Sequence, residues 1–119
     1  MSISENVNGK ITDLHYLMDL SKGNKVFVKE MIDIFLSENP EEIKSIAAGI
    51  AENNYDVIKA TSHKLRSTIP FIGLDKLIEK EVEEIELLAS EHGDMNEIKL
   101  RFLKIKEMCE KACCELQPV

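Results

Sequence analysis

The sequence contains no tryptophan and few other aromatic residues, with four phenylalanines and two tyrosines among 119 residues. It therefore offers no obvious platform on which nucleic-acid bases stack, and its formal net charge of −7 also opposes binding to a polyanion. No apolar run approaches the roughly 18 residues that a membrane helix needs. The opening residues, MSISENVNGK, lack the apolar segment of a signal peptide. We expect a cytoplasmic protein that binds neither nucleic acid nor membrane.

Cysteine is confined to one short stretch, where Cys109, Cys113 and Cys114 lie close together. Thiols this close in sequence cannot link distant parts of a fold through disulfides. Cys109 and Cys113 are four residues apart and are expected to share one face of a helix. A zinc ion needs three or four protein ligands, and no further cysteine or histidine lies nearby to complete such a set. We therefore expect reduced thiols packed in a helix and no metal site.

Glycine and proline are also scarce, at five and three residues, and they lie mostly between segments of helical periodicity. No segment shows the sustained alternation of a β-strand. The sequence predicts a single all-α domain over residues 1–119, with its core at about 11–115. Short loops between amphipathic helices favour antiparallel neighbours. We therefore expect an up-and-down four-helix bundle, built from the helices after residue 40, with one or two extra N-terminal helices packed against it.

The periodic segments and their breaks also predict where the helices begin and end. The clearest helix start is Asn39-Pro40, with Asn39 as the cap and Pro40 at the first helical position. Gly73 is expected to end the helix that carries the most informative segment of the chain. The expected helices cover about residues 11–21, 25–38, 40–52, 55–72 and 75–91, with a last helix from about 95 onward.

An acid-rich stretch falls within the expected helix over 75–91. On a helix, Glu79, Glu83 and Glu86 share a face that is separate from the apolar stripe. A di-iron bundle pairs such glutamates with an inward Glu-x-x-His motif, which this sequence lacks. We interpret the stretch as a solvated helix face.

The segment around His63 carries the strongest functional signal. At about 100° per residue, a helical wheel places a mostly apolar set of residues opposite this histidine. That set consists of Val57, Ile58, Thr61, Leu65, Thr68, Ile69 and Ile72. Lys59, Arg66, Ser67 and Pro70 lie on the same side as His63. The histidine is therefore expected to project into solvent from the middle of a rigid helix.

The same segment reverses the sign of the overall charge. No acidic residue occurs between Asp56 and Asp75, whereas Lys59, Lys64 and Arg66 are cationic. A histidine ring is partly neutral near pH 7 and is then a nucleophile that needs no helper base. Phosphoryl transfer needs stabilisation of negative charge more than covalent assistance, and nearby cations supply that stabilisation. The pattern therefore favours a phosphoryl carrier.

The run from His63 to Thr68, His-Lys-Leu-Arg-Ser-Thr, resembles the pattern of the histidine-containing phosphotransfer (HPt) family, His-x-Leu-Lys-Gly-Ser. Gly73 stands at the same offset as a glycine of that family, and the resemblance covers about residues 11–115. It implies that His63 is the phosphorylated residue and that Arg66 steadies the phosphoryl group. It also implies that Ser67, at a small-residue position, gives a partner room to approach.

Three residues depart from the family pattern. Arg66 replaces lysine, which keeps the charge but changes the hydrogen-bonding geometry. Ser67 replaces glycine and adds a hydroxyl beside the site. Pro70 lies inside the expected helix and should kink it one to two turns after His63, which would reshape the docking surface.

The resemblance implies a phosphorelay protein that exchanges a phosphoryl group with receiver-domain aspartates through Nε2 of His63. Arg66 and Lys64 are expected to offset the charge of this group, with Lys59 a weaker candidate. Such a protein is a carrier without independent enzymatic turnover. The implied partners are response-regulator receiver domains and a hybrid sensor histidine kinase. The receiver supplies Mg²⁺, so no cofactor is expected on this chain.

We expect this protein to be a monomer. The apolar part of its docking surface is expected to come from Phe71 and from residues such as Leu17 or Phe27.

Two other interpretations remain open. A histidine-kinase dimerisation helix has a similar motif, but that family has an acidic residue after the histidine, where this chain has Lys64. It also needs an ATP-binding domain, whose glycine-rich motifs this sequence lacks. The second alternative is a helical interaction module that binds a signalling partner without being phosphorylated. His15 and His92 lack cationic surroundings and are assigned no role.

Overall fold

The computed structural model describes residues 10–117, and all regular structure in this range is helical. A short 3₁₀ helix, η1 (Ile69–Ile72), continues directly from the end of one α-helix. The α-helices are α2 (His15–Leu20), α3 (Lys25–Ala51), α4 (Tyr55–Thr68), α5 (Asp75–Ser90) and α6 (Met95–Leu116). The predicted all-α fold class is confirmed over these residues. No helix among them has the length and apolar composition needed to cross a membrane.

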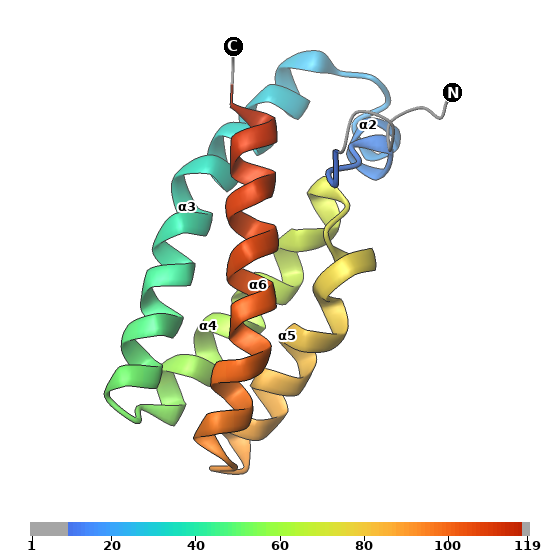
Figure 1. Cartoon of the computed structure of the whole chain (residues 1–119). Coiled ribbons are helices and arrows are strands. Elements are labelled where there is room, and N and C mark those ends of the chain that lie inside the picture. Colours follow the sequence, from blue (N-terminus) through green and yellow to red (C-terminus); the bar gives the residue numbers. More distant parts are fainter. Residues whose placement is uncertain (1–9, 118–119) are drawn as a thin grey trace.

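The four long helices lie side by side, and the chain direction alternates from one to the next (Figure 1). Helix α3 packs chiefly against α4 and α6, and α5 packs against the same two helices. Helix α2 lies at one end, where it contacts η1 and α3. Because α3 and α5 flank α4 on its two sides, these two helices determine the surroundings of His63.

Apolar residues from all four long helices form one continuous core. Burial of a side chain such as isoleucine or leucine stabilises the fold by about 1.5–3 kcal/mol. This packing therefore holds α4 firmly between its neighbours. Fully buried members include Ile46 of α3, Ile58 and Leu65 of α4, Ile78 and Ile85 of α5, and Ile98 and Ile105 of α6.

The predicted helix start at Asn39-Pro40 is wrong. Helix α3 runs unbroken from Lys25 to Ala51 and contains Pro40 in its interior. Asn39 does not cap a helix: it is 1% exposed, and its amide donates to Sγ of Cys109 at 3.5 Å. Phe35 and Ile43, on either side of the proline, both belong to the core. Tertiary packing therefore outweighs the loss of one backbone hydrogen bond at Pro40.

The helix expected over 55–72 divides into α4 and η1. The side chain of Asn54 accepts the N–H of Val57 and caps the start of α4, which is α-helical to Thr68. Pro70 has no N–H for an α-helical bond, and the chain tightens there into the 3₁₀ turn. The change of geometry thus follows α4, and the turn that carries His63 is regular helix.

Gly73 ends this segment, as predicted, for two physical reasons. Its φ of 78° lies in the left-handed region that favours glycine. An added Cβ would lie 2.6 Å from Cβ of Asp13 and 2.7 Å from its carbonyl oxygen. The N–H of Asp13 donates to the carbonyl of Ile72 at 2.8 Å, so the segment before α2 crosses directly over this turn.

The first expected helix, over 11–21, is shorter than predicted because α2 begins only at His15. The residues before it are held by Glu115 near the end of α6. Its carboxylate accepts the backbone N–H groups of Ile11 and Thr12 at 2.9–3.0 Å and the hydroxyl of Thr12 at 2.8 Å. The N–H groups of Ile11 and Thr12 therefore bond to a side chain instead of to carbonyls within a helix.

Candidate functional site

His63 projects outward from α4, as the helical wheel predicts. Its side chain is 72% exposed, whereas Ile58, Leu65 and Ile69 on the opposite side of the segment are fully buried. The neighbouring Ser62 is also buried, which the wheel did not indicate. The histidine is thus accessible to another molecule while its backbone is fixed by the core.

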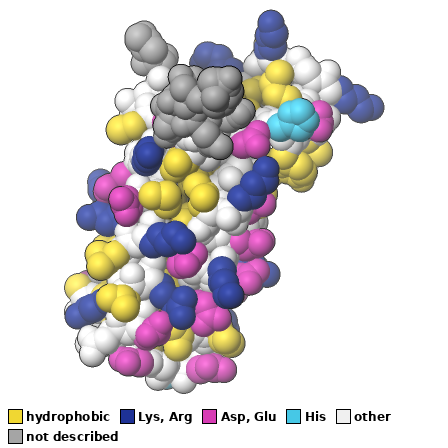
Figure 2. All heavy atoms as spheres, turned by 45° about the vertical axis from the view of Figure 1, so that its right-hand side comes forward, with side chains coloured by type: hydrophobic (Ala, Val, Ile, Leu, Met, Phe, Trp, Pro, Cys, Tyr) yellow, Lys and Arg dark blue, Asp and Glu magenta, His cyan; other side chains and the backbone are white. Residues whose placement is uncertain are grey.

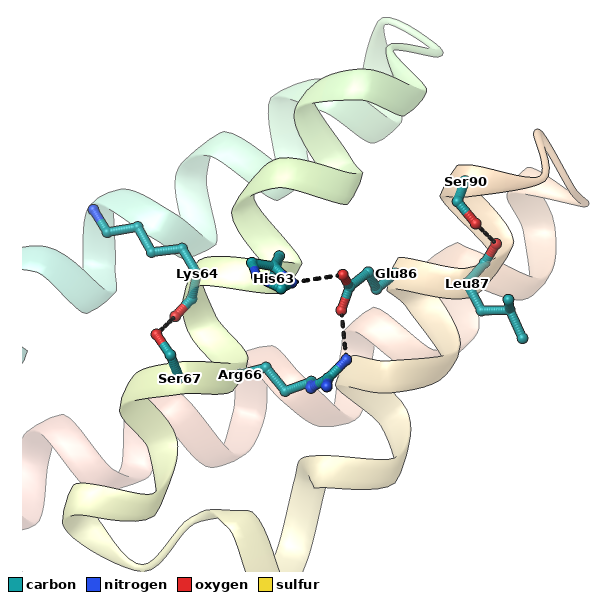
Figure 3. Close-up of polar contacts among 7 residues, drawn as sticks. All are labelled: His63, Lys64, Arg66, Ser67, Glu86, Leu87 and Ser90. Atoms are coloured by element: carbon teal, nitrogen blue, oxygen red, sulfur yellow. Dashed lines mark hydrogen bonds and ion pairs between the residues drawn. The ribbon is translucent and has the colours of Figure 1, made fainter.

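One ring nitrogen of His63 is engaged by a carboxylate from α5. Nδ1 lies 2.8 Å from Oε2 of Glu86 (Figure 3). An ionised carboxylate only accepts hydrogen bonds, so this contact favours the ring form in which Nδ1 carries the proton. In the neutral ring of that form, the lone pair resides on Nε2. The exposed nitrogen is therefore the nucleophilic one.

Arg66 shares the same carboxylate. Its Nη1 donates to Oε1 of Glu86 at 2.9 Å, so the two oxygens of one side chain bind the imidazole and the guanidinium separately (Figure 3). The Glu86 side chain is only 17% exposed, which limits screening of these contacts by water. Glu86 therefore fixes His63 and Arg66 next to each other.

Lys64 points away from His63, toward α3 (Figure 3). Its Nζ lies 3.8 Å from Oε1 of Glu38 and 3.7 Å from Oε2 of Glu42. Burial raises the pKa of the Glu42 carboxyl, and the Lys64 charge opposes that shift. Two cations were expected beside the histidine. Arg66 lies next to His63, whereas Lys64 does not.

The remaining residues of the motif are placed along the same helix. Ser67 is exposed, but its hydroxyl donates to the carbonyl of Lys64 at 2.7 Å and is turned back onto the helix. The hydroxyl of Thr68 donates to the carbonyl of Leu65 at 3.1 Å in the same way. Lys59 is exposed on the preceding turn. Of the two hydroxyl side chains, that of Ser67 lies on the same side of the helix as His63, and its hydroxyl is already bonded.

Glu86 is the site residue that sequence reasoning missed, and its interpretation as part of a solvated face is wrong. Glu79 and Glu83 are exposed, as expected, but Glu86 lies against α4. It comes four residues after the buried Val82 and directly after the buried Ile85, so it borders the core stripe of α5. This position beside the core stripe is the sequence signal from which the contact of Glu86 with a neighbouring helix could have been predicted.

The other two histidines have different surroundings. His15 is exposed on α2, with Nε2 3.6 Å from a carboxylate oxygen of Asp19 one turn later. His92 stacks on the ring of Tyr55, with ring centroids 4.6 Å apart and the planes inclined by 8°. Neither has an arginine and a carboxylate arranged as they are around His63.

Three further expectations concern cysteines, metals and docking. Cys109 is buried and Cys113 half-buried, and both contact Asn39. Within residues 10–117, no three side chains of the metal-ligating types gather closely enough to hold an ion. Leu17 has no exposed surface, so its expected docking role is wrong: α2 uses it to attach to the core. Phe71 remains half-buried.

Comparisons of the chain with protein-family models, with curated proteins and with solved structures gave no match.

Proposed function

We propose that this protein is a histidine phosphotransfer protein of a multistep phosphorelay, with the four long helices as an up-and-down four-helix bundle. One observation carries the proposal: His63 is exposed on a rigid helix and its Nδ1 is held by Glu86 at 2.8 Å. This arrangement leaves Nε2 free for attack on an incoming phosphorus atom. The HPt-like motif supports the same reading.

In the proposed reaction, the Nε2 lone pair attacks the phosphorus of a receiver-domain phosphoaspartate. The N–P bond forms while the P–O bond to the aspartate breaks, and the aspartate leaves as a carboxylate. The ring keeps its proton on Nδ1 and gains positive charge, which the Glu86 carboxylate offsets. The reverse sequence of bond changes returns the phosphoryl group to a second receiver.

Arg66 is the cation best placed to offset the charge of the phosphoryl group. Its guanidinium and the His63 ring contact the same carboxylate, and a guanidinium has further donors that this contact leaves free. Lys64 can assist only if it leaves Glu38 and Glu42. Ser67 contributes a small side chain at the approach to the histidine.

The partners in this proposal are receiver domains of response regulators and a hybrid sensor histidine kinase. The receiver supplies Mg²⁺ and the acidic pocket, so the chain acts as a carrier without a cofactor or turnover of its own. On the face drawn in Figure 2, apolar side chains form small patches among acidic and basic ones. The small size of these patches supports a monomer that meets its partners transiently.

Phosphotransfer from a phosphorylated receiver domain tests the proposal. We expect label on the wild-type chain as an acid-labile, base-stable adduct, and no label on His63→Gln. His15→Gln is the matched control, because His15 is also exposed and also lies near a carboxylate. Label that persists in His63→Gln, or no transfer from any receiver of the same organism, would contradict the proposal.

The alternative is a helical module that binds a signalling partner without phosphorylation. The pairing of Lys64 and Arg66 with carboxylates favours it, since neither cation is unpaired in the structure. Binding of a receiver by both wild type and His63→Gln, with no label on either, is the result that would support this alternative.

A further inference from the structure

A small groove opens where the first half of α3 meets the end of α4 and η1. Its walls are apolar side chains of Met31, Ile34 and Phe35 from α3 and of Phe71 from η1, and its volume is about 40 Å³. Glu38, Asn39 and Glu42 complete the lining from α3. The groove therefore combines an apolar channel with an acidic end.

At the acidic end, two carboxyl groups share one ammonium group. Glu42 is 5% exposed, and its Oε2 has no hydrogen-bond partner among the described residues. The nearest cation, Nζ of Lys64, lies 3.7 Å away, and the same ammonium also serves Glu38 at 3.8 Å. A buried carboxylate oxygen without a donor is costly, so this end of the groove favours an additional cationic donor.

We propose that the groove binds an arginine side chain presented by a partner protein. The methylene stem of arginine suits the apolar walls, and its planar guanidinium carries enough donors to reach both Glu42 and Glu38. Pockets for free small molecules typically hold about 300–1,000 Å³, which is far more than this groove. The groove is therefore of a size for part of one side chain, anchored by a larger protein contact around it.

The occupant also has a consequence for the neighbouring site. A guanidinium at Glu38 and Glu42 joins the ammonium of Lys64 as a second cation, and the repulsion between the two positive charges loosens Lys64. Lys64 directly follows His63, so its release adds a mobile positive charge beside the histidine. Binding in the groove does not itself depend on phosphorylation of His63, and its failure would leave the proposed phosphotransfer untouched.

NMR titration with side-chain analogues tests the proposal. n-Propylguanidinium is the arginine side chain, and n-propylurea is its uncharged near-isostere. We expect saturable shifts of the Met31 and Ile34 methyl signals and the Phe71 ring signals, with about tenfold tighter binding of n-propylguanidinium, because charge-assisted hydrogen bonds add at least this much. Equal binding of the two probes would show an apolar side-chain pocket instead. Tighter binding of n-butylammonium would assign a lysine, and no saturable shift would overturn the proposal.

Three variants test whether binding depends on the groove or on the general charge of the surface. Glu42→Gln should remove the preference for n-propylguanidinium over n-propylurea. Glu41→Gln, an exposed neighbour on the same helix that pairs with Lys44 at 3.5 Å outside the groove, should retain it. Glu38 is half-exposed, so Glu38→Gln leaves the core intact. If Glu42→Gln fails to fold, Glu38→Gln takes its place and should weaken the same preference. Equal loss in Glu41→Gln and Glu42→Gln would contradict a specific site.

Discussion

Gly73→Ala tests how the segment before α2 is attached to the turn that follows the histidine helix. Gly73 has a φ of 78°, and an added Cβ would lie 2.6–2.9 Å from Cβ, carbonyl oxygen and nitrogen of Asp13. Gly23 has nearly the same φ, 79°, but an added Cβ there would meet no atom of a non-adjacent residue within 4 Å in the described part of the chain. The two glycines therefore separate backbone strain from steric overlap.

The magnitude follows from these two contributions. A non-glycine residue in the left-handed region costs about 1–2 kcal/mol, and loss of glycine flexibility in the unfolded chain returns about 0.4–1 kcal/mol. Gly23→Ala should therefore lower the free energy of unfolding by about 1 kcal/mol. In Gly73→Ala, the overlap of the new Cβ with the backbone of Asp13 adds about 1–3 kcal/mol to this loss of stability. The hydrogen bond from Asp13 to Ile72 is strained as well. The expected loss is about 3 kcal/mol.

Urea denaturation monitored by circular dichroism measures both variants. A domain of this size has a denaturant slope of about 1–3 kcal/mol per molar urea, so Gly73→Ala should lower the midpoint by about 1 M or more. Gly23→Ala should lower it by about a third of that amount. Equal losses in the two variants would refute the close contact between Asp13 and the Gly73 turn.

Three further outcomes are expected. In Glu86→Gln, the neutral His63 ring should change from a form protonated mainly on Nδ1 to a mixture of tautomers, because an amide both accepts and donates hydrogen bonds. ¹⁵N NMR of the ring detects this change. Burial alone would raise the pKa of Glu115, but hydrogen bonds from the segment before α2 lower it below the ordinary value of 4.5. The resulting stability is lost as the pH falls below about 4.5, and the urea midpoint of Glu115→Gln should depend less on pH in that range. Burial raises the pKa of Cys109 to about 12, so iodoacetamide at about pH 8 should modify the exposed Cys114 in the folded protein and Cys109 only after unfolding.

The exposure of His63 was predictable because helical periodicity encodes which side of a helix is buried. Ile58, Leu65, Ile69 and Ile72 repeat at the spacing of one helix face, and all four are buried in the core. The left-handed end at Gly73 was predictable for a similar reason, since few residues other than glycine adopt that conformation. Both predictions depend on residues that are close together in the sequence, so long-range packing does not change them.

The break expected at Asn39-Pro40 failed because a local signal competed with long-range packing. Asn39 is drawn into the core by contacts with Cys109 and Cys113, which lie about 70 residues later in the chain. A capping asparagine and a buried asparagine look the same in sequence. The contacts that distinguish them come from α6.

The charge around His63 was also misjudged from the local sequence. The absence of acidic residues between Asp56 and Asp75 suggested an unopposed cationic surface. Glu86 of α5 and Glu38 and Glu42 of α3 supply the opposing charges across the helix interfaces. Which carboxylate meets which cation depends on how the helices are aligned, and helical periodicity does not contain that alignment.

The most direct measurement is the position of the phosphoryl group after transfer from a phosphorylated receiver domain, determined by ³¹P and ¹H NMR of the intact chain. Because Glu86 engages Nδ1, the expected product is a single phosphohistidine at Nε2 of His63. A phosphoryl group on Nδ1, on His15 or His92, or on no histidine at all would contradict the proposed role of His63.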